Sequence, residues 1–192
     1  MKYFDISPTI SEKTAVFPGD VAFERNQSMS FQKGHHLELS SIRTTLHIGA
    51  HADASNHYHA KGKGIDARSL EPYLGKCQVI RVQKKSGERI YPEDIASVEI
   101  QAERILFCTN SFPNPDEWNS DFNSLSPELI RFLAKKNVQL VGIDTPSVDP
   151  EDSKKLESHQ AIFETNMCVL EGIILNEVPQ GLYTLIALPL KI

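Results

Sequence analysis

Short apolar runs recur along the chain at a length typical of β-strands. Each run is rich in Val, Ile, Leu or Phe and is bounded by polar or turn-forming residues. The runs cover Cys77–Val82, Arg104–Cys108, Val138–Ile143, Val169–Leu175 and Tyr183–Leu188. We predict that each of them forms a strand of a β-sheet.

The segment 126–137 carries the strongest helix pattern. Ser126 is a good N-cap, Pro127 suits the first helical position, an apolar stripe follows, and Asn137 closes a basic last turn. A second, weaker helix start lies at 91–95, and a third helix is predicted from Ser153 toward Thr165. Helices therefore alternate with strands in the second half of the chain, whereas the first half predicts strands and loops. We expect an α/β fold with a mixed β-sheet and packed helices.

The composition is that of an ordinary globular protein. The chain has 192 residues, of which 40% are hydrophobic and 23% are charged, which excludes collagen, coiled-coil and disordered classes. At roughly 150 residues per domain, a single domain over residues 1–192 is expected. The 20 Lys and Arg residues are outnumbered by 25 Asp and Glu residues and form no basic block. This balance argues against nucleic acid and acidic lipid as partners and favours a small molecule.

The sequence also predicts where the protein resides. Asp5 and Pro8 come before any apolar run that could serve as a signal peptide, and no stretch approaches the roughly 20 apolar residues of a membrane span. Cys77, Cys108 and Cys168 are far apart among apolar neighbours, which predicts buried reduced thiols rather than disulfides. We expect a soluble, cytoplasmic protein.

A cluster of histidines is the clearest chemical signal. Four of the seven histidines lie within residues 47–59, where even scattering would place about 0.5. His47, His51, Asp53 and His57 all occupy odd positions, so an extended backbone would project them to one side. A helix would turn Asp53 about 200° away from His51. The pattern favours a strand that presents these four side chains together.

Two imidazoles and a carboxylate, separated by small residues, form an N/O donor set that suits zinc, manganese or iron and leaves positions open for water and substrate. The alternative interpretation is an exposed polar strand with histidines that have no common role. The combination of residues favours a metal site. The sequence contains neither the G-x-S-x-G motif of serine hydrolases nor the H-E-x-x-H motif of zincins.

The run from His47 to His57 resembles the H-x-G-x-H-x-D-x-x-x-H signature of cyclase-like metal-dependent hydrolases, and within them the bacterial kynurenine formamidases (arylformamidases). The resemblance is collinear over most of the chain. The other matching segments are Asp5–Ser7, Phe17–Asp20, Pro72–Cys77, Gly142–Pro150, Ser153–Lys154, His159, Leu170–Glu171 and Leu185–Leu190.

The resemblance implies a fold of the swivelling β/β/α type, a homodimer, and two metal ions per subunit, usually zinc, with manganese as the alternative. The implied metal ligands are His47, His51, Asp53, His159 and Glu171, with Asp53 and Glu171 shared between the ions. His57 is implied to be the acid/base and Phe17 to contact the substrate. The implied reaction is the hydrolysis of N-formyl-L-kynurenine to L-kynurenine and formate in tryptophan degradation. Glu171 supports a ligand role independently, because a carboxylate within an apolar strand is costly unless it is paired or metal-bound.

Three positions depart from the family pattern. Phe17 stands where Trp is frequent, so the aromatic face remains but the indole N–H is lost. Ser55 replaces a usual Pro, and Ala50 replaces the Thr of the broader family, as is common in the kynurenine branch. Two alternatives therefore remain open: a sibling hydrolase of another aryl amide or an isatin-like lactam, and a non-catalytic metal-binding protein.

Overall fold

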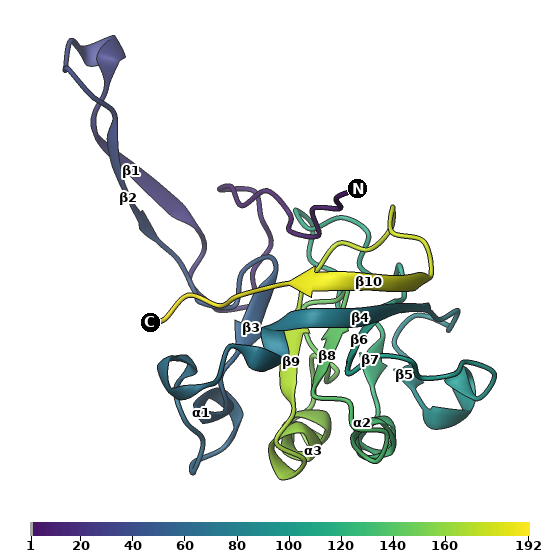
Figure 1. The fold of residues 1–192 in the computed structure, drawn as a ribbon. Coiled ribbons are helices and arrows are strands. Elements are labelled where there is room, and N and C mark those ends of the chain that lie inside the picture. Colours follow the sequence, from purple (N-terminus) through teal and green to yellow (C-terminus); the bar gives the residue numbers. More distant parts are fainter. Residues whose placement is uncertain (1) are drawn as a thin grey trace.

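A six-stranded mixed sheet forms the centre of the protein. The structure is a computed structural model that describes residues 2–192, and its strand order is β10-β4-β6-β8-β9-β3 (Figure 1). The strands are β3 (His51–Asp53), β4 (Leu74–Arg81), β6 (Arg104–Cys108), β8 (Leu140–Ile143), β9 (Cys168–Glu171) and β10 (Gly181–Ile186). Neighbouring strands from β4 to β9 run parallel, whereas β10 and β3 pair antiparallel at the two edges. The predicted α/β fold with a mixed sheet is confirmed.

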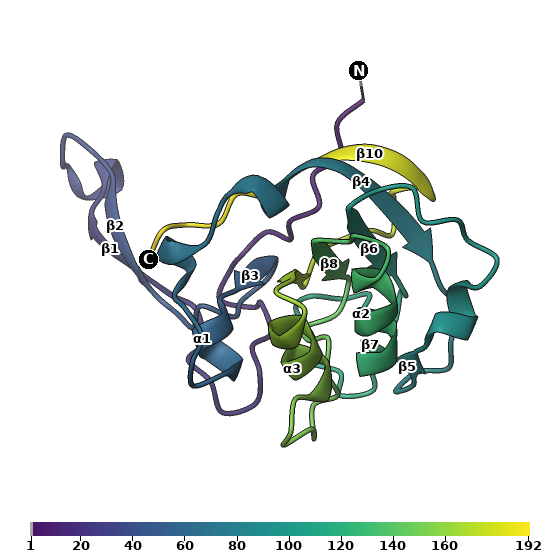
Figure 2. The same cartoon turned by 60° about the horizontal axis from the view of Figure 1, so that its bottom comes forward.

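Two helices, α2 (Pro127–Ala134) and α3 (Glu157–Glu164), pack on one face of this sheet (Figure 2). The helix α2 begins as its sequence predicts, because the Ser126 hydroxyl accepts the N–H of Leu129 at 3.0 Å. Its apolar stripe is fully buried against Phe107 and Val141 of the sheet. A third, one-turn helix α1 (Ser55–Tyr58) packs beside α3.

The other face of the sheet carries a second apolar core. Leu106, Leu140 and Leu170 point to this side, where Tyr73 and Ile173 cover them. Both faces of the central strands are therefore buried, which explains why their sequences are apolar throughout rather than alternating. The helices of residues 2–192 are too short or too polar to cross a lipid bilayer.

Two small sheets lie outside the central one. The strands β1 (Glu24–Met29) and β2 (Leu39–Arg43) form an antiparallel ribbon that projects from the body of the molecule (Figure 1). The strands β5 (Arg89–Ile90) and β7 (Ser124–Leu125) form a short parallel pair. Single 3-10 turns complete the elements: η1 (Phe31–Lys33), η2 (Ile65–Ala67), η3 (Glu71–Tyr73) and η4 (Pro92–Ile95).

All five predicted strands are present, with shifts at their ends. The strand predicted over 169–175 stops at Glu171, because Gly172 has a φ of +64°. The helix pattern at 91–95 yields only the turn η4, and the helix predicted from Ser153 starts at Glu157, because Leu156 adopts the left-handed conformation with a φ of 49°. The prediction of buried free thiols is confirmed for all three cysteines.

Candidate metal centre and aromatic pocket

The pairing of β3 with β9 places the first predicted site residues together. In this antiparallel pair His51 lies opposite Glu171 and Asp53 lies opposite Val169. The Nε2 atom of His51 is 3.3 Å from Oδ1 of Asp53 and 3.3 Å from Oε2 of Glu171. A cross-strand pair at the edge of the sheet thus gathers two carboxylates around one imidazole.

Two glycines make this close approach possible. Gly49 and Gly172 both have positive φ, at +56° and +64°, and a Cβ atom on Gly172 would lie 2.1 Å from the carbonyl oxygen of Gly49. The backbones therefore touch where no side chain could fit. The bend at Gly49 also returns the preceding His47 toward the strand, so that its Nδ1 lies 3.0 Å from Oδ1 of Asp53.

The prediction that one extended run carries the whole cluster is wrong. Only His51–Asp53 is a strand, and His57 lies on the helix α1. His57 still faces the cluster, because its ring centroid is 4.0 Å from that of His47 and its Nε2 is 3.9 Å from Oδ2 of Asp53. A bend at Gly49 and a helical turn bring these side chains together, rather than the alternation of side chains along one strand.

The fifth predicted ligand, His159, comes from the first turn of α3. Its Nε2 atom is 3.4 Å from Oδ2 of Asp53 and 3.3 Å from Oε1 of Glu171. The side chain is buried, as are those of Asp53 and Glu171. Residues far apart in the sequence thus meet at one edge of the sheet.

These side chains form two groups that could each hold a metal ion. One group is His47, His51 and Asp53, and the other is Asp53, His159 and Glu171, each with its donor atoms within 4.8 Å of one another. Asp53 belongs to both groups. Glu171 turns one oxygen toward His51 and the other toward His159. His57 belongs to neither group, and its side chain is 43% exposed.

The donor atoms fit a cation. Within residues 2–192, the buried Nε2 atoms of His51 and His159 and both carboxylate oxygens of Asp53 lack a hydrogen-bond partner. Buried polar atoms of this kind are rare unless a ligand satisfies them. Imidazole nitrogens with carboxylate oxygens match the preferences of zinc or manganese. We conclude that the cluster is suited to hold metal ions.

The ionisable side chains of the cluster shift one another's pKa values. Burial alone would raise the pKa of Asp53, but His159, His47 and His51 hold it well below its usual value. Burial would likewise lower the pKa of His51, yet Asp53 and Glu171 raise it to about 10. The pKa of His159 is raised for the same reason, by Asp149, Asp53 and Glu171 against the effect of burial. Metal binding at His51 and His159 would therefore displace protons from these two imidazoles.

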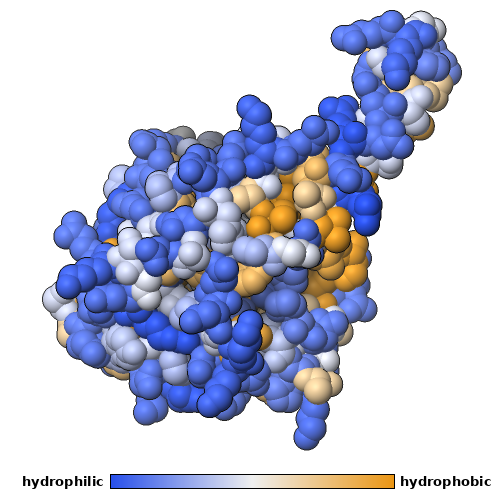
Figure 3. Space-filling model, turned by 180° about the vertical axis from the view of Figure 1, so that it is seen from behind, coloured by the Kyte–Doolittle hydropathy of each residue, from blue (hydrophilic) through white to orange (hydrophobic). Residues whose placement is uncertain are grey.

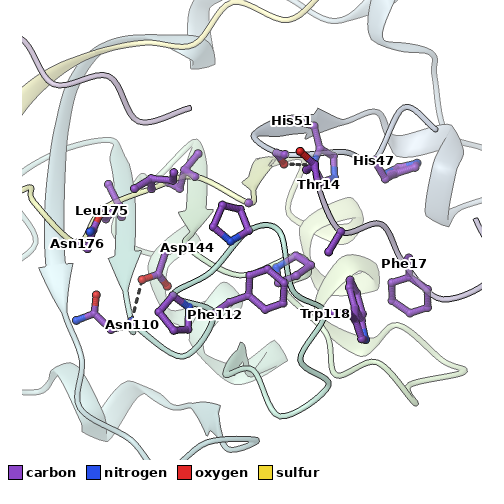
Figure 4. Close-up of a pocket in the computed structure, with 18 residues that line it drawn as sticks. Thr14, Phe17, His47, His51, Asn110, Phe112, Trp118, Asp144, Leu175 and Asn176 are labelled. Atoms are coloured by element: carbon purple, nitrogen blue, oxygen red, sulfur yellow. Dashed lines mark hydrogen bonds between the residues drawn. The ribbon is translucent and has the colours of Figure 1, made fainter. Parts of the chain in front are cut away.

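An aromatic pocket opens beside the cluster (Figure 4). His47 and His51 line one end of it, and Phe17, Phe112 and Trp118 form a wall on the other side. The ring centroid of Trp118 is 5.2 Å from that of Phe17 and 5.8 Å from that of Phe112. The described residues that line the pocket include no lysine or arginine.

Sequence reasoning found Phe17 but missed Phe112 and Trp118. Both belong to the loop 109–123, whose only sequence signal was an unusual concentration of aromatic residues among Asn, Pro and Ser. The loop is held in place by Asp144, whose carboxylate accepts the backbone N–H groups of Thr109 and Asn110 at 2.9 Å. The indole N–H of Trp118 is itself engaged, since it donates to Glu151 at 2.9 Å. Trp118 therefore presents an apolar face to the pocket.

Known proteins share this architecture. The model of a family described as "Putative cyclase" matches residues 4–150. The kynurenine formamidase of Bordetella petrii is 41% identical over 192 residues, which cover 100% of this chain and 91% of that protein. The corresponding protein of Polaromonas naphthalenivorans is 41% identical, with 100% of this chain and 85% of that protein covered.

A solved structure of a predicted metal-dependent hydrolase from Bacillus stearothermophilus superposes with a TM-score of 0.82 at 26% identity, covering 98% of this chain and 90% of the other. Isatin hydrolase A from Labrenzia aggregata has the same fold, with a TM-score of 0.84 at 23% identity and coverage of 98% and 87%.

Proposed function

We propose that this chain, which belongs to the cyclase family, is a metal-dependent arylformamidase. The reaction is the hydrolysis of N-formyl-L-kynurenine to L-kynurenine and formate, a step of tryptophan degradation. The similarity to kynurenine formamidases extends over the full chain. The observation that carries the proposal is a shared carboxylate, Asp53, between two potential metal groups at the end of an aromatic pocket.

We assign two zinc ions to the cluster, with manganese as the alternative. His47, His51 and Asp53 would hold the first ion, His159 would complete the second, and Asp53 and Glu171 would be shared by both. Metal ions at such a site lower the pKa of bound water and polarise a carbonyl oxygen. The amide carbonyl of Gly49 supports the ligand His51 by accepting a hydrogen bond at 3.0 Å from its Nδ1.

We assign the proton transfers to His57. Burial lowers the pKa of His57. The charge of Asp53 raises this pKa, but the neighbouring His47 and His159 lower it again, so the net shift is downward. The imidazole is therefore neutral near pH 7 and can take a proton from the attacking water. It would then donate this proton to the aniline nitrogen as the C–N bond breaks. Its position outside both metal groups leaves it free for this role.

The aromatic wall would bind the substrate's ring. Phe17 is 37% exposed and stands edge-to-face with Trp118, which leaves room for a further ring to pack edge-on or offset against them. A planar aryl amide suits this pocket better than an aliphatic one. The described lining residues include no lysine or arginine, so none of them offers such a side chain to the substrate's carboxylate.

The direct test is hydrolysis of N-formylkynurenine by protein stripped with a chelator, before and after zinc is added. We expect activity to vanish on stripping and to return with zinc. The surface variant Glu164→Gln, which loses only an exposed pair with Arg131, should behave like the unmodified chain. A chain that holds two zinc ions but leaves the formamide intact would refute the function. Isatin, assayed in parallel, tests the second candidate, a lactam hydrolase, which the departures at Phe17 and Ser55 leave open.

We further propose that the protein is a cytoplasmic homodimer. Three free thiols support a reducing compartment. Exposed apolar side chains continue along the C-terminal segment, at Ile186, Leu188, Leu190 and Ile192. The surface view shows apolar atoms gathered beside the base of the projecting ribbon (Figure 3). A patch of this kind marks an interface more often than a free surface.

Light scattering on a sizing column measures the oligomer directly. The homodimer predicts about twice the 21.5 kDa mass of the chain. Leu190→Glu should lower the mass toward that of one chain, because it places a charge in the patch. Leu182→Glu, near the start of β10 and away from the C-terminal segment, should leave the dimer unchanged. A monomer at all concentrations would contradict the proposal.

A further inference from the structure

His159 is held by a buried carboxylate that the proposed function does not use. Oδ2 of Asp149 lies 2.8 Å from Nδ1 of His159, and the same carboxylate accepts the backbone N–H groups of Ser158 and His159 at 3.0 Å. Asp149 has no exposed surface. One side chain thus fixes both the imidazole ring and the backbone at the start of α3.

Arg89 holds this carboxylate from the other side. Its Nη1 donates to Oδ1 of Asp149 at 3.0 Å and to the hydroxyl of Ser158 at 2.8 Å. Its Nη2 donates to Glu157 at 3.0 Å. The Arg89 side chain is only 18% exposed, so solvent screens its pairing with Asp149 weakly. The strand β5, outside the central sheet, is therefore connected to the metal cluster through the partly buried Arg89 and the buried Asp149.

This arrangement selects the form of the His159 ring. The Asp149 carboxylate accepts hydrogen bonds from Arg89 and from two backbone N–H groups, so its oxygens act as acceptors toward their neighbours. Nδ1 of His159 must then carry the hydrogen, which leaves Nε2 directed at Asp53 and Glu171. His51 differs, because its Nδ1 faces the backbone carbonyl of Gly49. Within residues 2–192, the second group alone has an imidazole that is held by a side chain from outside both groups.

We propose that Asp149 and Arg89 are positioning residues that orient His159 and thereby set the metal affinity of the Asp53, His159 and Glu171 group. The group of His47, His51 and Asp53 does not depend on them. The inference rests on the two metal sites of the proposed function but not on its substrate. Residues that support a metal ligand in this way typically contribute 10- to 100-fold in metal affinity.

Zinc titration of the full chain, stripped with a chelator and competed against a chromogenic chelator, tests the proposal without substrate. In Asp149→Asn we expect one of the two zinc ions to bind about 10- to 100-fold more weakly, while the other binds as before. Arg89→Gln should weaken the same ion by a smaller factor. Asp149→Glu, which restores a carboxylate, should recover part of the affinity. The matched control is Glu157→Gln, which removes the other carboxylate of Arg89 without touching His159.

Several outcomes would overturn the proposal. Unchanged affinity for both ions in Asp149→Asn would do so, and so would equal weakening of both, which indicates a general loss of structure. The melting temperature of the metal-free variants separates these cases, and Arg89→Gln serves if Asp149→Asn does not fold. An unmodified chain that binds a single zinc ion would also overturn it. Failure of the proposed function looks different, since the chain would bind two zinc ions with the expected asymmetry yet hydrolyse no formamide.

Discussion

The polar end and the aromatic wall of the pocket are positioned by different kinds of structure. The polar end depends on strand register, with His51 opposite Glu171, and on the buried start of α3. The aromatic wall comes from loops, with Phe17 and Trp118 both partly exposed. Chemistry that needs fixed distances is therefore placed at the edge of the sheet and on the helices beside it, whereas contacts that decide which molecule fits are placed on loops, which tolerate change.

The largest expected effect comes from removing the carboxylate shared by both groups. Asp53→Ala should abolish hydrolysis and zinc binding together, because Asp53 contributes to each group. Elemental analysis and the formamidase assay measure the two losses. Asp121→Ala, at an exposed position, is the control. An Asp53→Ala variant that kept two zinc ions would break the assignment of a shared ligand, and Glu171→Ala provides the same test from β9.

His57 separates chemistry from metal binding within the polar end. His57→Ala should lower turnover by about 10²- to 10⁴-fold, the range for losing a general acid/base, with zinc content nearly unchanged. His36→Ala, at an exposed position, should have no effect. If zinc were lost with the activity, His57 would be a ligand and the assigned role would be wrong.

Acid should lower the stability of the folded protein, because it protonates Asp149 beside the polar end of the pocket. The pKa of Asp149 is lowered to about 2 in the folded protein, below its ordinary value of 3.8, so the stabilisation is present above pH 4 and is lost as the pH falls toward 2. At about 1.4 kcal/mol per pH unit, this amounts to about 2 kcal/mol. Urea unfolding with chelator present should show a smaller loss of stability over this range in Asp149→Asn. Identical pH profiles would show that Asp149 has no such role.

The aromatic wall should produce the smallest effects and affect binding rather than turnover. Trp118→Ala and Phe17→Ala should each raise KM by up to about tenfold, the scale of one aromatic pair, with little change in kcat. Tyr3→Ala, at an exposed tyrosine, is the control. Trp118 is the only tryptophan of the chain, so its fluorescence should change when L-kynurenine binds. Unchanged kinetics and fluorescence would place the substrate's ring elsewhere.

The sequence predicted the strands and the first metal group better than the rest of the site. Apolar runs identified the central strands because both faces of the sheet are buried. The spacing of His47, His51 and Asp53 indicated a metal site, although the bend at Gly49 and the helix of His57 replaced the expected strand. Both signals are local, since each strand shows as an apolar run and the first metal group lies within seven residues of the chain.

The other parts of the site depend on long-range contacts that no local pattern reports. His159 was found only through the family resemblance, and for Glu171 the sequence added only the cost of a carboxylate within an apolar strand, because strand pairing and the docking of α3 decide what these two residues face. Asp149 lies among turn-forming residues in a segment that matched the family pattern, and nothing in its neighbourhood in the sequence indicated its contact with Arg89 or His159. Trp118 and its loop could not be placed because a loop's position follows from its anchor, here Asp144. The family membership and the kynurenine formamidase resemblance are confirmed by the comparisons.

The projecting ribbon of β1 and β2 has a consequence for the shape of the molecule in solution. A compact chain of 192 residues has a radius of gyration of about 16 Å. The ribbon places part of the mass well outside the body (Figure 1), so small-angle scattering from an isolated chain should give a larger value and a long tail in the distribution of interatomic distances. If two copies enclose each other's ribbons, that tail should shorten relative to the particle's size. The scattering profile would then report how the ribbons are packed.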